Sequence, residues 1–151
     1  MRVVVASDHA GYDLKENIRE YLSELGIPAE DLGTSSASEG VDYTDYAAAV
    51  ADRVRLGKAD RGILVCSTGV GVCITANKIP GIRAAVAWHP EIARLSRAHN
   101  DANVLCLSGK FTEPKLAREL LKIWLVTPFD GGRHQRRVDK IAILEGQNSQ
   151  A

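Results

Sequence analysis

The segment Gly62-Ile63-Leu64-Val65-Cys66-Ser67-Thr68-Gly69-Val70-Gly71-Val72-Cys73 predicts a strand, a tight turn and a helix in succession. Its first five residues form a continuous apolar run, which is typical of a strand buried on both faces. The two glycines that follow permit the turn, and a short helix should then extend to about Asn77. Strands of this kind occur mainly in parallel sheets that helices cover on both sides.

The same alternation of strand and helix extends along the rest of the chain. Four further runs, rich in apolar and β-branched residues, are expected to be strands: residues 3–5, 27–32, 82–87 and 104–107. Apolar residues at helical spacing predict five more helices: one that ends at Gly26, one between Asp42 and Gly57, one from Pro90 to about Ala98, one that Thr112 opens, and one from about His134 to Glu145, which Gly146 stops.

Strands separated by helices predict an α/β fold of the three-layer, Rossmann-like kind, with a five-stranded parallel sheet and helices on both faces. The 151 residues fit a single domain, in which about residues 147–151 are expected to form a flexible tail. Ligands of such sheets bind beyond the carboxyl ends of the strands. That rule selects Asp8 and His9, residues 66–71, and the segment after Leu107 as candidate site residues.

Composition excludes several classes of function. The 19 Lys and Arg residues balance the 19 Asp and Glu residues, so the chain lacks the excess positive charge that is typical of nucleic-acid-binding proteins. No apolar stretch approaches the roughly 18 residues of a membrane span, so no membrane partner is expected. The three cysteines are odd in number and lack a C-x-x-C spacing, which argues against both a disulfide framework and a zinc site. We therefore expect a cytoplasmic protein.

The turn at residues 66–71 carries the strongest chemical signal. Its glycines let backbone N–H groups approach an anion, and the N-terminus of the following helix adds partial positive charge. The same charge favours a thiolate at Cys66, which could act as a general base or a nucleophile. The alternative is that Cys66 is a small buried strand residue and the glycines only serve the turn. A dinucleotide site is excluded, because G-x-G-x-x-G would require glycine where Ile74 stands.

Basic side chains and histidines supply weaker signals. Arg133 and Arg137 are four residues apart on the last predicted helix and follow two glycines, so they could clamp a phosphate. Alternatively, they belong to a solvated basic face. His9 and His99 could move protons, although scattered single histidines are more often structural. No pair of histidines has metal-ligand spacing, so neither a metal nor another cofactor is expected.

Four ordered blocks of sequence resemble the family of type B ribose-5-phosphate isomerases, which includes galactose-6-phosphate and allose-6-phosphate isomerases. The blocks are Ser7-Asp8-His9-Ala10-Gly11 with Leu14-Lys15; Cys66-x-Thr68-Gly69-x-Gly71 with Ala76-Asn77-Lys78 and Gly81-Ile82-Arg83-Ala84; His99-Asn100-Asp101-Ala102-Asn103-Val104-Leu105; and Gly131-Gly132-Arg133-His134 through Arg137. They are spread from residue 7 to residue 137, so the resemblance covers essentially the whole chain.

The resemblance implies a cofactor-independent aldose–ketose isomerase that interconverts ribose 5-phosphate and ribulose 5-phosphate through a cis-enediolate. Cys66 would be the general base, Thr68 would stabilise the enediolate together with the loop N–H groups, and His99 would help to open the furanose ring. The substrate-binding residues would be Asp8, His9, Ser67, Gly69, Val70, Gly71, Asn100, Lys110, Arg133 and Arg137. The family also implies a homodimer or dimer of dimers with shared active sites, in which the partner subunit supplies His99 and Asn100.

Three residues depart from the family pattern, which often has Arg at Lys110, Gly at Ser67 and Ser at Cys73. Lysine cannot make the bidentate contact with phosphate that arginine makes. These departures leave the sugar open, and isomerases of six-carbon sugar phosphates are an alternative. Two other classes remain: a noncatalytic phospho-ligand or nucleotide-binding module, and a thiol redox sensor in which Cys66 pairs with Cys73.

Overall fold

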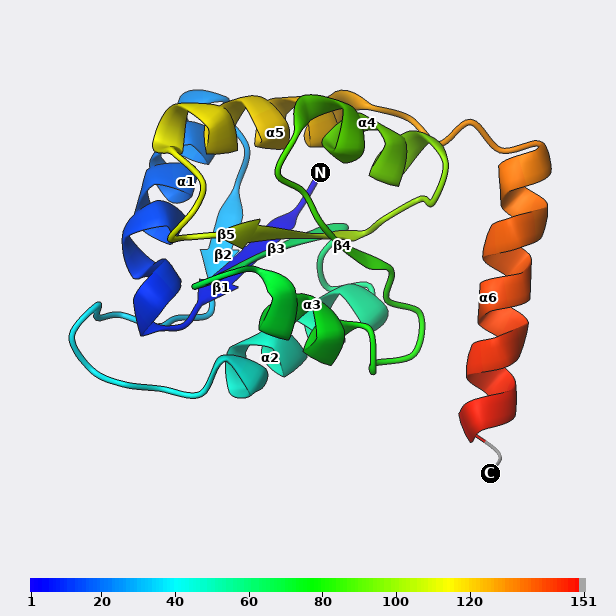
Figure 1. Ribbon diagram of the computed structural model, residues 1–151, viewed down its shortest axis with the longest axis horizontal. Coiled ribbons are helices and arrows are strands. Elements are labelled where there is room, and N and C mark those ends of the chain that lie inside the picture. Colours follow the sequence, from blue (N-terminus) through cyan, green and yellow to red (C-terminus); the bar gives the residue numbers. More distant parts are fainter. Residues whose placement is uncertain (150–151) are drawn as a thin grey trace.

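The computed structural model describes residues 1–149, and in that range five strands form one sheet (Figure 1). They are β1 (Val3–Ser7), β2 (Ala29–Asp31), β3 (Arg61–Cys66), β4 (Ala84–Val86) and β5 (Val104–Ser108). Their order across the sheet is β2-β1-β3-β5-β4, and every neighbouring pair is parallel. The predicted five-stranded parallel sheet is therefore confirmed, with β2 and β4 shorter than the sequence suggested.

Helices cover both faces of this sheet. One face carries α1 (Tyr12–Glu24), α4 (Pro90–Ala98) and α5 (Pro114–Val126), and the other carries α2 (Tyr43–Arg55) and α3 (Val70–Ala76). Side chains of β3 alternate between the two: Ile63 and Val65 belong to the first core cluster, Leu64 and Cys66 to the second. Residues 62–66 are all buried, as their continuous apolar run predicted.

Most helix ends follow the local signals in the sequence. Gly26 comes after the C-cap of α1 and Gly57 after that of α2, each with φ of 69°, in the left-handed region that glycine adopts without strain. These two predicted stops are confirmed. Thr112 does not open α5, because the helix begins at Pro114 with Glu113 as its N-cap.

The last helix is longer than predicted. α6 (Arg133–Ser149) continues through Gly146, so the expected stop at this glycine is wrong. A glycine weakens a helix without breaking it, and a Cβ at this position would meet no atom within 4 Å. Residues 147–149 of the expected flexible tail are thus helical, and residues 150–151 lie outside the described part of the chain.

α6 stands apart from the layered body (Figure 1). Its apolar side chains Ile141, Ile143 and Leu144 are 48%, 59% and 60% exposed. A cleft of about 730 Å³ separates it from the segment around β4, with Arg83 and Ala85 on one wall and Ile141 and Leu144 on the other. No helix within residues 1–149 has the length and apolarity needed to cross a membrane.

A buried lysine fixes the connection between β2 and α2. Lys15 on α1 is fully buried, and its Nζ donates to both carboxylate oxygens of Asp31, at 2.9 and 3.0 Å, and to the carbonyl of Thr34, at 2.6 Å. A buried charge persists when it is paired in this way. The backbone of residues 33–34 is thereby held against Ser7, where β1 ends.

Candidate active site

β3 delivers Cys66 to the carboxyl edge of the sheet, where the chain turns into α3. The Sγ of Cys66 accepts a hydrogen bond from the backbone N–H of Gly69, with 3.2 Å between sulfur and nitrogen. Gly69 has φ of 79°, and a Cβ there would stand 3.0 Å from the carbonyl carbon of Leu107. Only glycine combines this conformation with such a close approach. The thiol is therefore buried, and it faces the N-terminus of α3.

The remaining loop residues surround this thiol. Thr68 is exposed, and its Oγ1 accepts a hydrogen bond from the N–H of Val70 at 3.2 Å. Gly71 lies against the ring of Tyr43, since a Cβ on Gly71 would come within 2.7 Å of that ring. Sequence reasoning missed Tyr43. The available signal was its position at the start of a helix that follows a strand, because such helices begin near the carboxyl edge.

Asp8 and His9 lie next to this loop, as predicted, because β1 and β3 are neighbours. The Oδ1 of Asp8 accepts from the N–H of Gly11 at 3.0 Å, and its own N–H donates to the carbonyl of Val65 at 3.3 Å. The Nδ1 of His9 accepts from the N–H of Val41 at 3.2 Å. A neutral His9 with this contact carries its proton on Nε2, which remains available to a ligand.

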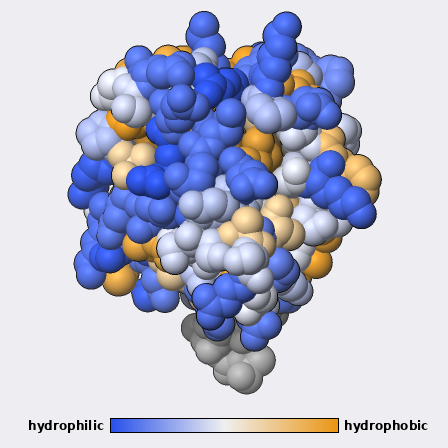
Figure 2. Space-filling view, turned by 90° about the vertical axis from the view of Figure 1, so that its left-hand side faces the viewer, coloured by the Kyte–Doolittle hydropathy of each residue, from blue (hydrophilic) through white to orange (hydrophobic). Residues whose placement is uncertain are grey.

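The end of β5 closes the same edge of the sheet. The hydroxyl of Ser108 donates to the carbonyl of Ser67 at 2.7 Å, and the N–H of Lys110 donates to the same oxygen at 3.1 Å. The Lys110 ammonium is exposed and lies 5.5 Å from the centre of the Phe111 ring. The segment after Leu107 thus belongs to the strand-end site that the sequence predicted. Figure 2 shows this side of the molecule, whose surface is largely hydrophilic.

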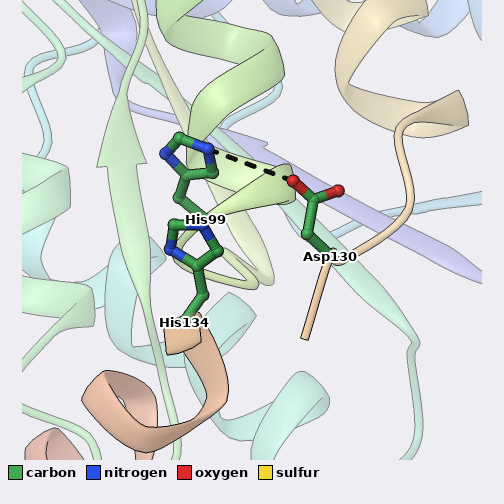
Figure 3. A group of neighbouring side chains, drawn as sticks. All are labelled: His99, Asp130 and His134. Carbon is green, nitrogen blue, oxygen red and sulfur yellow. Dashed lines mark ion pairs between the residues drawn. The ribbon is translucent and has the colours of Figure 1, made fainter. Parts of the chain in front are cut away.

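A second cluster lies where α4 ends and α6 begins (Figure 3). The rings of His99 and His134 are stacked, with centroids 4.0 Å apart and 10° between their planes. The Nε2 of His99 lies 4.0 Å from Oδ2 of Asp130, whose backbone N–H donates to the carbonyl of Ala98 at 2.9 Å. Burial lowers the pKa of His134, and positive charge on His99 and the neighbouring arginines lowers it further. His134 is therefore mainly neutral at pH 7.

A buried arginine holds the turn that carries His99 and Asn100. Arg97 donates through Nη1 to Oδ1 of Asp101 at 2.8 Å and to the carbonyl of Ala102 at 2.7 Å. Asp101 has φ of 47°, a conformation unusual for a residue other than glycine. Arg83 contacts the other carboxylate oxygen of Asp101, at 3.2 Å, and the carbonyl of Asn100, at 3.1 Å. Sequence reasoning missed this network. The four-residue spacing of Arg97 and Asp101 was the available signal, whereas the contacts of Arg83 depend on the tertiary structure.

The predicted site residues therefore form two groups. The strand-end group consists of Asp8, His9, residues 66–71 and Lys110. The arm group consists of His99, Asn100, Arg133 and Arg137. β3 and β5 pair with Gly62 opposite Val104 and Cys66 opposite Ser108. The arm group's His99 and Asn100 precede Val104, whereas Cys66 stands at the other end of the paired strands, roughly 13 Å away along the sheet. Within one chain the structure does not bring the two groups together.

The arm group carries positive charge. Arg133 and Arg137 are exposed, and neither makes an ion pair with a described residue. The ligand atoms of His99, Asp130 and His134 all lie within 4.8 Å of one another, so the residue types could hold a divalent cation. The adjacent arginine charges, which act on His134, oppose a cation and favour an anion.

Comparison with known proteins identifies this α/β architecture as that of an isomerase. Residues 3–141 match the family described as Ribose/Galactose Isomerase. The ribose-5-phosphate isomerase B of Escherichia coli K12 is 45% identical over 144 residues, which are 95% of this chain and 96% of the relative. The D-erythrulose-4-phosphate isomerase of Pectobacterium atrosepticum is 37% identical over 147 residues, which are 97% of each chain.

Solved structures share the whole fold. Ribose-5-phosphate isomerase B of Clostridium thermocellum superimposes with a TM-score of 0.96 at 45% identity, over 98% of this chain and 99% of that one. The Mycoplasma genitalium enzyme, solved with bound ribulose-5-phosphate, gives 0.92 at 43% identity, over 96% of each chain. The chain belongs to the ribose/galactose isomerase family, and the resemblance found in its sequence is confirmed.

Proposed function

We propose that the chain interconverts ribose 5-phosphate and ribulose 5-phosphate through a cis-enediolate, with Cys66 as the general base. The observation that carries this proposal is the placement of the Cys66 thiol. It is buried at the carboxyl end of β3, receives a hydrogen bond from Gly69 and faces the N-terminus of α3. The thiol therefore stands beside a loop that can bind an anion.

The reaction needs one proton to move between neighbouring carbons. Cys66 takes the proton from C2 of the open-chain aldose, and the electrons of that bond form the enediolate as the carbonyl oxygen at C1 becomes an oxyanion. The proton of the C2 hydroxyl passes to the oxygen at C1, the same thiol returns its proton to the C1 carbon, and the oxygen at C2 becomes the carbonyl of the ketose. A positioned base contributes about 10²–10⁴-fold to such a step. No step calls for a metal or a hydride carrier.

The glycine loop supplies the stabilisation of the oxyanion. The N–H of Gly69 contacts Cys66 and that of Val70 contacts Thr68, so the N–H of Gly71 in the first turn of α3 and the Thr68 hydroxyl would donate to the oxyanion. Preorganised donors of this kind are usually the largest single contribution to catalysis of reactions through an oxyanion. Asp8 would bind sugar hydroxyls beside the loop through the carboxylate oxygen that does not cap Gly11.

The separation of the two groups leads to the second part of the proposal. We propose that each active site combines the strand-end group of one chain with the arm group of a second copy. His99 would then help to open the furanose ring, Asn100 would bind sugar hydroxyls, and the two arginines would join His9 and Lys110 around the phosphate. The exposed apolar residues of α6 and the cleft beside it support association between copies.

Substrates of this class differ by single carbinol units. A relative that is 37% identical isomerises D-erythrulose 4-phosphate, so the family accepts more than one chain length. A phosphorylated sugar does not cross membranes unaided, which supports a cytoplasmic site of action. Turnover would be measured as ketose formation from ribose 5-phosphate in EDTA, with the aldoses allose 6-phosphate, galactose 6-phosphate and erythrose 4-phosphate in parallel.

We expect turnover of the pentose with little on the other three. Turnover of a hexose or tetrose phosphate alone would keep the mechanism and change the substrate. No turnover on any of them, by protein that binds phosphate, would contradict the proposed function and favour the binding module.

A further inference from the structure

A carboxylate lies at the centre of the turn that carries His99 and Asn100. It belongs to Asp101, whose backbone has φ of 47°, in the left-handed region. Asn and Asp enter this region more often than other side chains do, but the conformation persists only where surrounding contacts hold it. One such contact comes from α4, because the N–H of Asp101 donates to the carbonyl of Arg97 at 3.1 Å. The side chain of Asp101 makes the others.

Two arginines share the Asp101 carboxylate. Nη1 of Arg97 donates to Oδ1 at 2.8 Å, and Nη2 of Arg83 donates to Oδ2 at 3.2 Å. The side chain of Arg97 is only 5% exposed, so solvent screens its ion pair with Asp101 much less than it screens a surface pair. Because Arg97 lies on α4 and Arg83 directly precedes β4, the carboxylate joins the end of one element to the start of the other.

The same guanidiniums hold the backbone of the turn. Nε of Arg83 donates to the carbonyls of Asn100 and Asp101, at 3.1 and 3.0 Å. Nη1 of Arg97 donates to the carbonyl of Ala102 at 2.7 Å. Three successive carbonyls are thus bound by two side chains that the Asp101 carboxylate orients.

Arg97 also fixes the segment on the other side of the His99 ring. Its Nε donates to the carbonyl of Thr127, at 3.4 Å, where α5 ends. Asp130 follows, with its N–H bound to the carbonyl of Ala98 at 2.9 Å and its carboxylate 4.0 Å from Nε2 of His99. The imidazole therefore stands between two backbone segments that one buried guanidinium contacts.

The Asp101 carboxylate also offsets positive charge. Arg61 is a third cation at this place, since its Nη1 donates to the carbonyl of Ala102 at 3.3 Å. Burial and the charge of Arg97 lower the pKa of Arg61, and the charge of Asp101 opposes that effect. Without the carboxylate, repulsion would push the guanidiniums apart, and the carbonyls of the turn would lose their donors.

We propose that Asp101 is a positioning residue for ring opening, which acts through His99. The catalytic consequence rests on the proposed function, whereas the control of the ring's position does not. In ring opening the C1 hydroxyl loses a proton, the bond from C1 to the ring oxygen breaks, and that oxygen gains a proton, so the imidazole gives one proton and takes one. A displacement of about 1 Å can cost 10²-fold in such a step, so the support of the turn matters.

The position of the ring is tested without measuring activity. Stacking on His134 shifts the NMR signals of the His99 ring upfield, and those signals are identified by their loss in His99→Asn. In Asp101→Asn they should move toward the values of a free histidine, because asparagine tolerates the same φ and removes only the charge. Asp52→Asn, which breaks an exposed ion pair on α2, is the matched control and should leave them in place. Unmoved signals in folded Asp101→Asn would overturn the proposal.

A second variant makes the same test if the Asp101→Asn chain does not fold. Arg83→Lys keeps the positive charge, but a lysine cannot contact the carboxylate and two carbonyls together. Its His99 signals should move in the same direction as those of Asp101→Asn. Signals that stay in place in Arg83→Lys would overturn the proposal equally.

The catalytic consequence is tested by a double-mutant cycle on kcat. Asp101→Asn should lower kcat for ribose 5-phosphate by about tenfold in the wild-type background. In His99→Asn, whose residual turnover draws on sugar that opens unaided in water, the same substitution should lower kcat less than twofold. Equal losses in both backgrounds would overturn action through His99. An absence of turnover in the wild type would instead contradict the proposed function, and the NMR comparison would still decide whether Asp101 positions the ring.

Discussion

The sulfur of Cys66 lies 3.2 Å from the backbone nitrogen of Gly69, so the thiol and the anion-binding loop form one unit. β3 supplies the thiol, and the left-handed turn at Gly69 points an N–H group back at it. The base and the donors that would stabilise the enediolate are thereby fixed relative to each other before substrate binds. Preorganisation of this kind is what makes such donors effective.

Replacing Cys66 by alanine should lower kcat by about 10²–10⁴-fold, because the proton at C2 loses its base. Substrate binding should change little, because the phosphate contacts lie elsewhere. Steady-state kinetics and calorimetric binding of ribose 5-phosphate measure the two effects separately. Cys106→Ala is the matched control, since it removes a buried thiol of the same sheet that does not face the loop. Equal losses of turnover in the two variants would move the base to another residue.

Gly69→Ala should lower both stability and turnover. An alanine with φ near 79° is strained by roughly 1–2 kcal/mol, and its Cβ would press on the carbonyl of Leu107. Gly81→Ala is the matched control, because Gly81 has φ of 83° with no atom within 4 Å of a Cβ. Urea denaturation should show the larger loss for Gly69→Ala, and only that variant should lose turnover. Similar losses of stability would mean that the contact with Leu107 is unimportant.

Arg137→Ala should raise KM for ribose 5-phosphate by roughly tenfold to a hundredfold while kcat changes less. A charge-assisted hydrogen bond to phosphate contributes about 1.5–3 kcal/mol, and each 1.4 kcal/mol is a factor of ten. Arg136→Ala removes an exposed charge from the preceding position of α6 and should leave KM nearly unchanged. If the two variants behave alike, the arginines form only a solvated basic face.

His134 should make stability sensitive to mild acid. Its pKa is lowered from 6.5 in the folded protein, so below pH 6.5 the unfolded chain binds a proton that the folded chain does not. The free energy of unfolding should therefore fall as pH drops from 6.5 toward the lowered pKa, and this contribution is constant above 6.5. His134→Gln should flatten that slope in urea titrations across the range. His89→Asn, which keeps a capping side chain on α4, should retain it.

Local patterns in the sequence predicted the structural features that depend on residues close to one another in the chain. The apolar run before Cys66, the glycine stops after α1 and α2, and the strand-end position of Asp8 all follow from sterics and burial of short segments. The sequence could predict that members of the strand-end group lie close together, because parallel strands place their carboxyl ends at one edge of the sheet. Its contacts with Ser108 and Lys110 follow from the same rule.

Features that depend on distant residues were not predictable in this way. The apolar positions of α6, such as Ile141 and Leu144, look like those of a packed helix, and their spacing does not reveal that the helix stands apart. The contact of Cys73 on α3 with Ala84 on β4 depends on the packing of a helix against a sheet whose strand order is not sequential. The stack of His99 on His134 likewise joins two segments that only the tertiary structure brings together.

The claim that each site combines two copies of the chain is tested most directly by mixing two inactive variants. Cys66→Ala removes the strand-end base, and His99→Asn removes the arm histidine. When equal amounts are unfolded and refolded together, half of the dimers should be mixed, and one of the two sites in each mixed dimer would carry neither substitution. We expect about one quarter of the wild-type turnover to return, on the statistics of a two-fold dimer. Turnover no greater than the sum of the separate variants would contradict the shared site.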